Sequence, residues 1–293
     1  GVQTCALPIS IYNLQANSLI FNNTQAVFNV LYSRGTSNFN ATTQLLGNTN
    51  FTLSSQSLLN FNGDTTLQNN ANITLGNKSQ AAFKNSLTLD NNSNLSLDNQ
   101  SVLNANGTSA FNNQASLNIY NGSQATFNSL FFNGGTLSLN ANSKLNASNA
   151  SFSNNTTINL DDSVLSASNT SSLNANINFQ GASQADFGGN TTIETASFNF
   201  DSASSLSFNN LTANGALNFN GYAPSLTKAL MSVSGQFVLG NNGDINLSDI
   251  NIFDNITKSV TYNILNAQKG ITGISGANGY EKILFYGMKI QNA

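Results

Sequence analysis

Apolar residues recur along the chain in short triplets in which two apolar side chains flank one polar side chain. Ile73-Thr74-Leu75, Leu87-Thr88-Leu89 and Leu95-Ser96-Leu97 are examples. Alternation with a period of two is typical of a strand that turns one face towards a core. The triplets are too short and too regularly spaced for hairpins with two-residue turns throughout. The pattern therefore predicts many short strands joined by polar corners.

The triplets belong to an internal repeat. Three successive segments, 62–83, 84–105 and 106–127, align without gaps and share three apolar columns. Each column advances by 22 residues (89 − 67 in the first column), and Leu45, Leu53 and Phe61 extend the columns backwards by one repeat. The columns consist of Leu67, Leu89 and Phe111; of Leu75, Leu97 and Ile119; and of Phe83, Ala105 and Phe127.

Three strands and three corners in each repeat describe one turn of a right-handed parallel β-helix, a solenoid of the all-β class. Each strand would then pair with its equivalent one coil later, about 4.8 Å away. The pattern continues with more variable corners to about residue 221, as in Leu137-Ser138-Leu139 and Leu217-Asn218-Phe219. Apolar groups such as Leu19-Ile20-Phe21 are places where the β-helix can begin. We therefore assign residues 11–221 to the β-helix.

Asparagine is the most frequent residue in the chain. Asparagine tolerates the left-handed backbone region and bonds its own backbone in tight turns. Stacked asparagines also bond one another along the stacking direction. We expect both roles here, with sharp corners at Asn-Gly pairs. These pairs lie at 62–63, 106–107, 121–122, 133–134, 214–215 and 220–221.

The two ends of the chain depart from the repeat. Residues 1–10 contain the only cysteine and no asparagine; they resemble a translated sequencing adapter, and an ordinary N-terminal linker is the alternative. After Gly221 the rhythm breaks and longer apolar alternation follows. We expect residues 222–293 to form a C-terminal capping region of mixed β-structure, because a solenoid end must be covered. A short helix around 224–231 and a late strand over 283–290 are expected within it.

Composition excludes several classes of partner and chemistry. Only 7% of residues are charged, the net charge is −3, and the nine Lys and Arg residues are scattered. A nucleic-acid partner would need a basic stripe. No segment approaches the run of roughly 20 apolar residues that a transmembrane helix needs. One cysteine allows no intrachain disulfide.

No catalytic, cofactor or metal site is expected, and the chain is predicted not to be an enzyme. It has no histidine, which excludes Ser–His pairs and imidazole metal sites. Asp161-Asp162 is the only acidic pair, and adjacent residues on a strand point to opposite faces. Asp90 and Asp98 follow strands, where aspartate is a common turn former.

Three segments, 61–83, 133–160 and 260–290, resemble the passenger domains of bacterial autotransporters, and most closely the vacuolating-cytotoxin-like family of gastric bacteria. The resemblance implies a passenger that is secreted or displayed at the bacterial outer membrane, exported by a C-terminal β-barrel translocator that is not seen in this sequence. The expected partner is a host cell-surface receptor or the extracellular matrix, in adhesion or colonisation. A vacuolating-type toxin subunit is the first alternative, and a polysaccharide-processing β-helix enzyme is the second.

Overall fold

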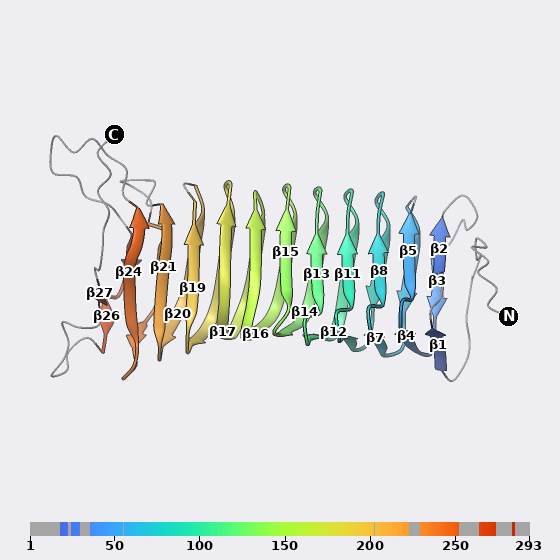
Figure 1. Ribbon diagram of the computed structural model, residues 1–293, viewed down its shortest axis with the longest axis horizontal. Coiled ribbons are helices and arrows are strands. Elements are labelled where there is room, and N and C mark those ends of the chain that lie inside the picture. Colours follow the sequence, from blue (N-terminus) through green and yellow to red (C-terminus); the bar gives the residue numbers. More distant parts are fainter. Residues whose placement is uncertain are drawn as a thin grey trace. The chain divides into compact units, whose positions relative to one another are not determined.

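The computed structural model consists of strands and turns. It describes residues 18–22, 25–29, 36–54, 56–201, 203–222, 229–251, 264–273 and 283–284, and none of these lies in a helix. Chain contacts divide the protein into two compact units between Ser148 and Asn149. Each unit is a parallel β-solenoid (Figure 1), so the all-β parallel β-helix class is confirmed.

The strands of unit 1 lie on three faces, named A, B and C. Face A holds β1 (Ser18–Asn22), β4 (Thr42–Leu46), β7 (Thr65–Gln68) and β10 (Leu87–Leu89). Face B holds β2 (Gln25–Asn29), β5 (Asn50–Ser54), β8 (Asn72–Leu75), β11 (Asn94–Leu97), β13 (Ser116–Ile119) and β15 (Thr136–Asn140). Face C holds β3 (Thr36–Phe39), β6 (Leu58–Phe61) and β9 (Gln80–Phe83). The longer strands β12 (Val102–Asn112) and β14 (Gln124–Asn133) run over face C and then face A.

Unit 2 repeats this arrangement, and β16 (Lys144–Asp161) is the strand in which the chain passes from the first unit to the second. In unit 2, β17 (Val164–Gln180), β18 (Gln184–Ile193) and β20 (Ser205–Ala213) cross more than one face. Face B holds β19 (Ala196–Phe200), β21 (Ala216–Tyr222), β24 (Asp244–Asn251) and β27 (Ile283–Leu284). Face C continues with β22 (Met231–Val233) and β25 (Leu265–Ala267), and face A continues with β23 (Phe237–Leu239) and β26 (Ile271–Thr272).

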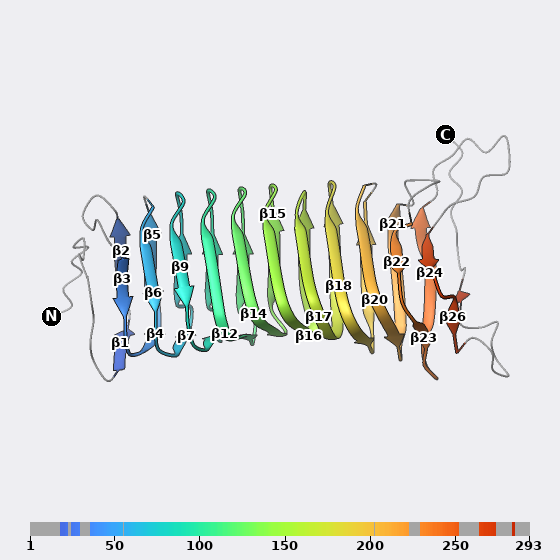
Figure 2. The ribbon, with the colours of Figure 1, turned by 180° about the vertical axis from the view of Figure 1, so that it is seen from behind.

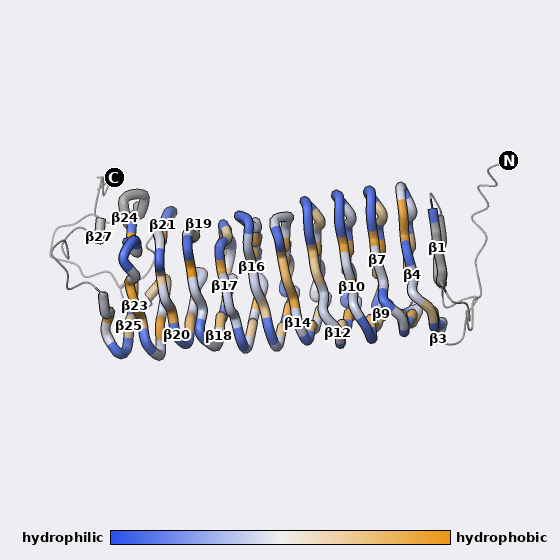
Figure 3. The backbone as a smooth tube through the Cα atoms, turned by 90° about the horizontal axis from the view of Figure 1, so that it is seen from below, coloured by the Kyte–Doolittle hydropathy of each residue, from blue (hydrophilic) through white to orange (hydrophobic). Residues whose placement is uncertain are grey.

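The observed register confirms the three apolar columns. Leu67 pairs with Leu89, which pairs with Phe111, and the other two columns pair in the same way. All of these side chains are buried. Polar and apolar residues accordingly alternate along the backbone tube (Figure 3). Because the pairing is parallel and without offset, one inward position in the repeat becomes one stack in the core.

Aromatic rings use this stacking directly. Phe61 lies on Phe83 with ring centroids 4.5 Å apart and planes 5° from parallel. In unit 2, Phe179 and Phe200 stack at 4.8 Å with planes 3° apart. These separations match the spacing of adjacent strands. The strand spacing thus sets the ring spacing, and offset stacking adds to the area that each ring buries.

The corners before and after β11 are built by pairs of left-handed residues. Asn91 and Asn92 have φ of 51° and 62°, and Asn99 and Gln100 repeat these values. The Ser93 N–H donates to the Asp90 carbonyl at 3.2 Å, which closes a turn with positive φ at both central residues. Asparagine is suited to such positions because its side chain tolerates the left-handed region. The expected corner role of asparagine is therefore confirmed at these turns, whereas the pairs Asn106-Gly107 and Asn220-Gly221 lie inside β12 and β21.

Asparagines also bond one another from coil to coil. In unit 2 the Asn178 amide donates to Asn159 at 2.7 Å, Asn199 donates to Asn178 at 2.6 Å, and Asn220 donates to Asn199 at 2.8 Å. In unit 1, Asn60 donates to Asn38 and Asn72 donates to Asn50, each at 2.8 Å across 22 residues. These asparagine ladders hold side chains of successive coils together, as expected from the sequence.

A column of buried serines was not expected. At one corner of each coil, a fully or almost fully buried serine follows the turn, and in many coils its hydroxyl donates to the carbonyl three residues earlier. The hydroxyl thus finds a backbone acceptor at the edge of the core, and in some coils it shares that carbonyl with the serine's own N–H, as Ser79 shares the Gly76 carbonyl. The serines at this position are Ser57, Ser79, Ser101, Ser123 and Ser143 in unit 1 and Ser163, Ser183 and Ser204 in unit 2.

Parallel stacking continues beyond residue 221, where we expected a cap to begin. β22 and β23 pair with β20, and β24 pairs with β21. The number of residues between hydrogen-bonded partners of adjacent coils increases here. It is 26 between Asn210 and Gln236 and 35 between Phe237 and Thr272. Most of the segment expected to be helical, and all of 285–290 and 1–10, lie outside the described residues.

Replacing a column residue should destabilise the fold strongly. For Leu97→Ala, which removes a fully buried side chain, we expect a loss of about 2–5 kcal/mol in the free energy of unfolding. Val102→Ala is the matched control, because Val102 is an apolar residue at an outward position of β12, and a loss below about 1 kcal/mol is expected there. Urea unfolding followed by circular dichroism measures both variants. Equal losses would contradict the assigned register.

The serine column makes a separate prediction. The Ser123 hydroxyl accepts a hydrogen bond from the buried Ser101 N–H at 3.1 Å. Ser123→Ala leaves that N–H without a partner, so we expect a loss of about 1–3 kcal/mol. Ser129→Ala, at a half-buried position of β14, should cost less than about 0.5 kcal/mol. The same unfolding measurement compares the two variants, and a neutral Ser123→Ala would show that the column is dispensable.

Candidate functional site

The outward side chains of both units are mostly neutral hydrogen-bonding groups. Among the described residues, Phe131 is the one large apolar side chain that is exposed, so they offer no broad apolar patch for docking. In the ladders the outward groups bind one another, as Asn159, Asn178, Asn199 and Asn220 do. Each of these bonds uses one of the two N–H donors of an amide and one acceptor position of an oxygen, so the ladders keep hydrogen-bonding capacity for a ligand.

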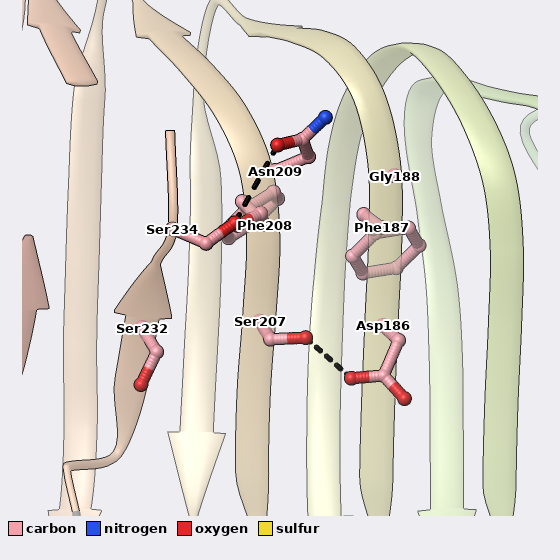
Figure 4. Close-up of a pocket in the computed structure, with 8 residues that line it drawn as sticks. All are labelled: Asp186, Phe187, Gly188, Ser207, Phe208, Asn209, Ser232 and Ser234. Atoms are coloured by element: carbon pink, nitrogen blue, oxygen red, sulfur yellow. Dashed lines mark hydrogen bonds between the residues drawn. The ribbon is translucent and has the colours of Figure 1, made fainter. Parts of the chain in front are cut away.

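A hollow in unit 2 differs in shape from the surface that carries these ladders. It lies where β18, β20 and β22 pass from face C to the next corner, and its volume is about 300 Å³ (Figure 4). Figure 2 shows these three strands side by side, in agreement with their parallel pairing. A volume of this size is at the lower end of the range for small-molecule sites. Its lining residues are Asp186, Phe187, Gly188, Ser207, Phe208, Asn209, Ser232 and Ser234.

Two aromatic rings of the core lie beneath the hollow. Phe187 and Phe208 occupy the same inward position in successive coils, with ring centroids 5.6 Å apart and planes 25° apart. Both rings are almost completely buried. They belong to the core stack and present almost no surface to the hollow.

Gly188 opens the corner. A Cβ at this position would lie 2.2 Å from the Ser168 carbonyl oxygen, so the close approach of two coils excludes any side chain here. On the other side, the Ser234 and Gly235 N–H groups donate to the carbonyls of Phe208 and Asn209, at 3.1 and 2.7 Å. These bonds hold the short strand β22 and its following corner against β20.

Three polar groups at the rim have bonding capacity left. Asp186 accepts a hydrogen bond from the Ser207 hydroxyl through Oδ1, and Oδ2 has no partner in the described part of the chain. Asn209 accepts from Ser234 at 3.4 Å through Oδ1, while its amide nitrogen points away from Ser234 (Figure 4). The Ser232 hydroxyl likewise has no partner among the described residues. Together the three side chains offer an acceptor, a donor and a group that is both.

The aspartates singled out in the sequence lie elsewhere and serve corners. Asp90 and Asp98 each accept from the next backbone N–H and from an asparagine amide of the following coil. Asp98 also affects Tyr120: burial, and to a smaller extent the negative charge of the Asp98 carboxylate, raises the pKa of the Tyr120 hydroxyl. Asp162 stands in a corner with φ of 46° and accepts the Ala182 N–H at 2.9 Å. No group of three potential metal ligands occurs among the described residues.

Asp186 was missed by the sequence analysis, although the signal was present. It is the polar centre of the triplet Ala185-Asp186-Phe187, and Ser207 is the centre of Leu206-Ser207-Phe208 in the next coil. Alignment of these two triplets would have placed the carboxylate next to the hydroxyl. Nothing in the two triplets indicates the hollow itself, which lies beside Gly188.

Asp64, in the corner before β7 of unit 1, repeats the carboxylate–serine pairing away from the hollow. Its Oδ1 accepts from the Ser86 hydroxyl at 2.7 Å and from the Ser86 N–H at 3.2 Å. These two hydrogen bonds, the hydroxyl bond first, lower the pKa of the Asp64 carboxyl. Because the carboxyl is well exposed, the resulting stabilisation is small.

The lowered pKa of Asp64 predicts a pH dependence. A carboxyl with a lower pKa in the folded than in the unfolded chain adds stability above the unfolded value of about 3.9, and this contribution is lost as the pH falls through the folded value. Asp64→Asn should therefore lower the Tm slightly at pH 7, and the difference from the parent protein should vanish at about pH 2. Thermal unfolding at several pH values measures this, and a pH-independent difference would contradict the assignment.

Comparisons with protein-family models, with curated proteins and with solved structures give no match. Within the residues that the structure describes, no helix is long and apolar enough to cross a membrane.

Proposed function

We propose that the chain is part of a secreted or surface-displayed autotransporter passenger whose solenoid exposes a binding surface to a host cell. The observation that carries the proposal is the outward side of the coils, where neutral amides and hydroxyls lie in register and apolar side chains are turned inward. Such a surface suits recognition by many directional hydrogen bonds. The resemblance of segments 61–83, 133–160 and 260–290 to autotransporter passengers supports the choice of host contact.

The low charge of the chain indicates which interactions would mediate the proposed contact. With 7% charged residues and a net charge of −3, the chain cannot depend on long-range electrostatic attraction, which salt screens over about 8 Å at physiological ionic strength. Binding to a host surface would depend on short-range hydrogen bonds and shape. Its strength should therefore change little with salt.

Binding of the purified, fluorescently labelled chain to host epithelial cells tests this proposal. We expect saturable binding that excess unlabelled chain displaces. We also expect the apparent Kd to change by less than about threefold between 0.15 and 0.5 M NaCl, because few charges are available to be screened. Absence of saturable binding, together with unchanged colonisation by a strain that lacks the gene, would refute the proposal. A steep salt dependence would refute the hydrogen-bonding mode of contact.

A further inference from the structure

We infer that the hollow between β18, β20 and β22 binds a neutral saccharide unit through Asp186, Asn209 and Ser232. The inference deepens the proposed function and rests on it for the assignment of a host glycan as the source. The hollow and its rim lie within one unit, so the site needs no other part of the chain.

The hydrogen-bonding inventory of the rim selects the chemistry of the ligand. Asp186 only accepts, the Asn209 amide nitrogen only donates, and the Ser232 hydroxyl does both. A ligand with several hydroxyl groups can satisfy all three, since each hydroxyl donates and accepts. An ammonium group can only donate and would leave the Asn209 nitrogen without a partner. An anionic ligand would meet the Asp186 carboxylate.

Charge alone does not favour a cationic ligand here. Asp186 is exposed, and its Oδ1 already accepts from Ser207. An ion pair at such a position contributes little because water and salt screen it. A hydrogen bond from a neutral hydroxyl to the free carboxylate oxygen is less sensitive to this screening and gains from the charge of the acceptor.

The size of the hollow agrees with the chemistry of the rim. Phe187 and Phe208 lie beneath the hollow and are almost completely buried, so the polar rim would make the contacts with a ligand. The volume of about 300 Å³ is suited to a sugar unit of a longer glycan better than to a folded partner.

A printed array of neutral, sialylated and sulfated glycans, probed with the purified chain, tests the inference. We expect saturable binding to a subset of neutral glycans. Asp186→Asn keeps an oxygen for Ser207 but loses the charged acceptor, and should weaken that binding at least about tenfold. Ser232→Tyr fills the hollow from an outward strand position and should abolish it. Asp64→Asn is the matched control, since it removes a carboxylate with the same serine pairing away from the hollow, and should bind as the parent does.

The outcomes separate this inference from the proposed function. Binding only to sialylated or sulfated glycans, or neutral-glycan binding that survives both hollow variants, would overturn the inference. So would an array without any bound neutral glycan. If the hollow variants lose neutral glycans on the array but still bind epithelial cells like the parent, the assignment of a host glycan to the site is refuted while the proposed host contact stands. If neutral glycans bind through the hollow but cells do not bind, the host contact is refuted while the site stands. Circular dichroism confirms that each variant is folded.

Discussion

The structure depends on parallel hydrogen bonding between each strand and its equivalent one coil away. At a spacing of about 4.8 Å, every side chain lies directly over the side chain at the same position of the next coil. An interaction between equivalent side chains is therefore repeated from coil to coil, whether it stabilises or destabilises the fold. This explains the low charge of the chain, because a column of identical charges at this spacing would repel itself, whereas apolar, amide and hydroxyl columns attract.

Asparagine is abundant because it meets two demands of this geometry. Corners need residues with positive φ, which Asn91 and Asn92 supply, and outward columns need side chains that both donate and accept along the stack. Glycine would meet only the first demand, and glutamine tolerates the left-handed region less well. Asparagine is not required at the second of the two left-handed residues of a corner. Lys78 and Gln100 occupy that position with φ of 64° and 62°.

Sequence reasoning could predict the columns because inward apolar residues repeat with constant spacing, as Leu67, Leu89 and Phe111 do. It could not predict the serine column, because a serine between two polar corner residues has the same pattern as a solvated turn. Its burial follows from the position of Ser101 after the turn, where the chain re-enters the core and the hydroxyl can reach the Asp98 carbonyl. Parallel strands after Gly221 were missed for a related reason: longer connections hide a repeat whose strands still stack.

The same regularity that stabilises the coils limits where a ligand can bind. In the ladder from Asn159 to Asn220, three amides donate to the preceding coil, so part of their bonding capacity is used within the ladder and one N–H group of each remains. More polar capacity is left unpaired where neighbouring coils differ. At Gly188 a side chain is missing, and Asp186, Asn209 and Ser232 form no ladder with one another among the described residues. Irregular coils, more than regular ones, are therefore the places where a solenoid of this composition can recognise a partner.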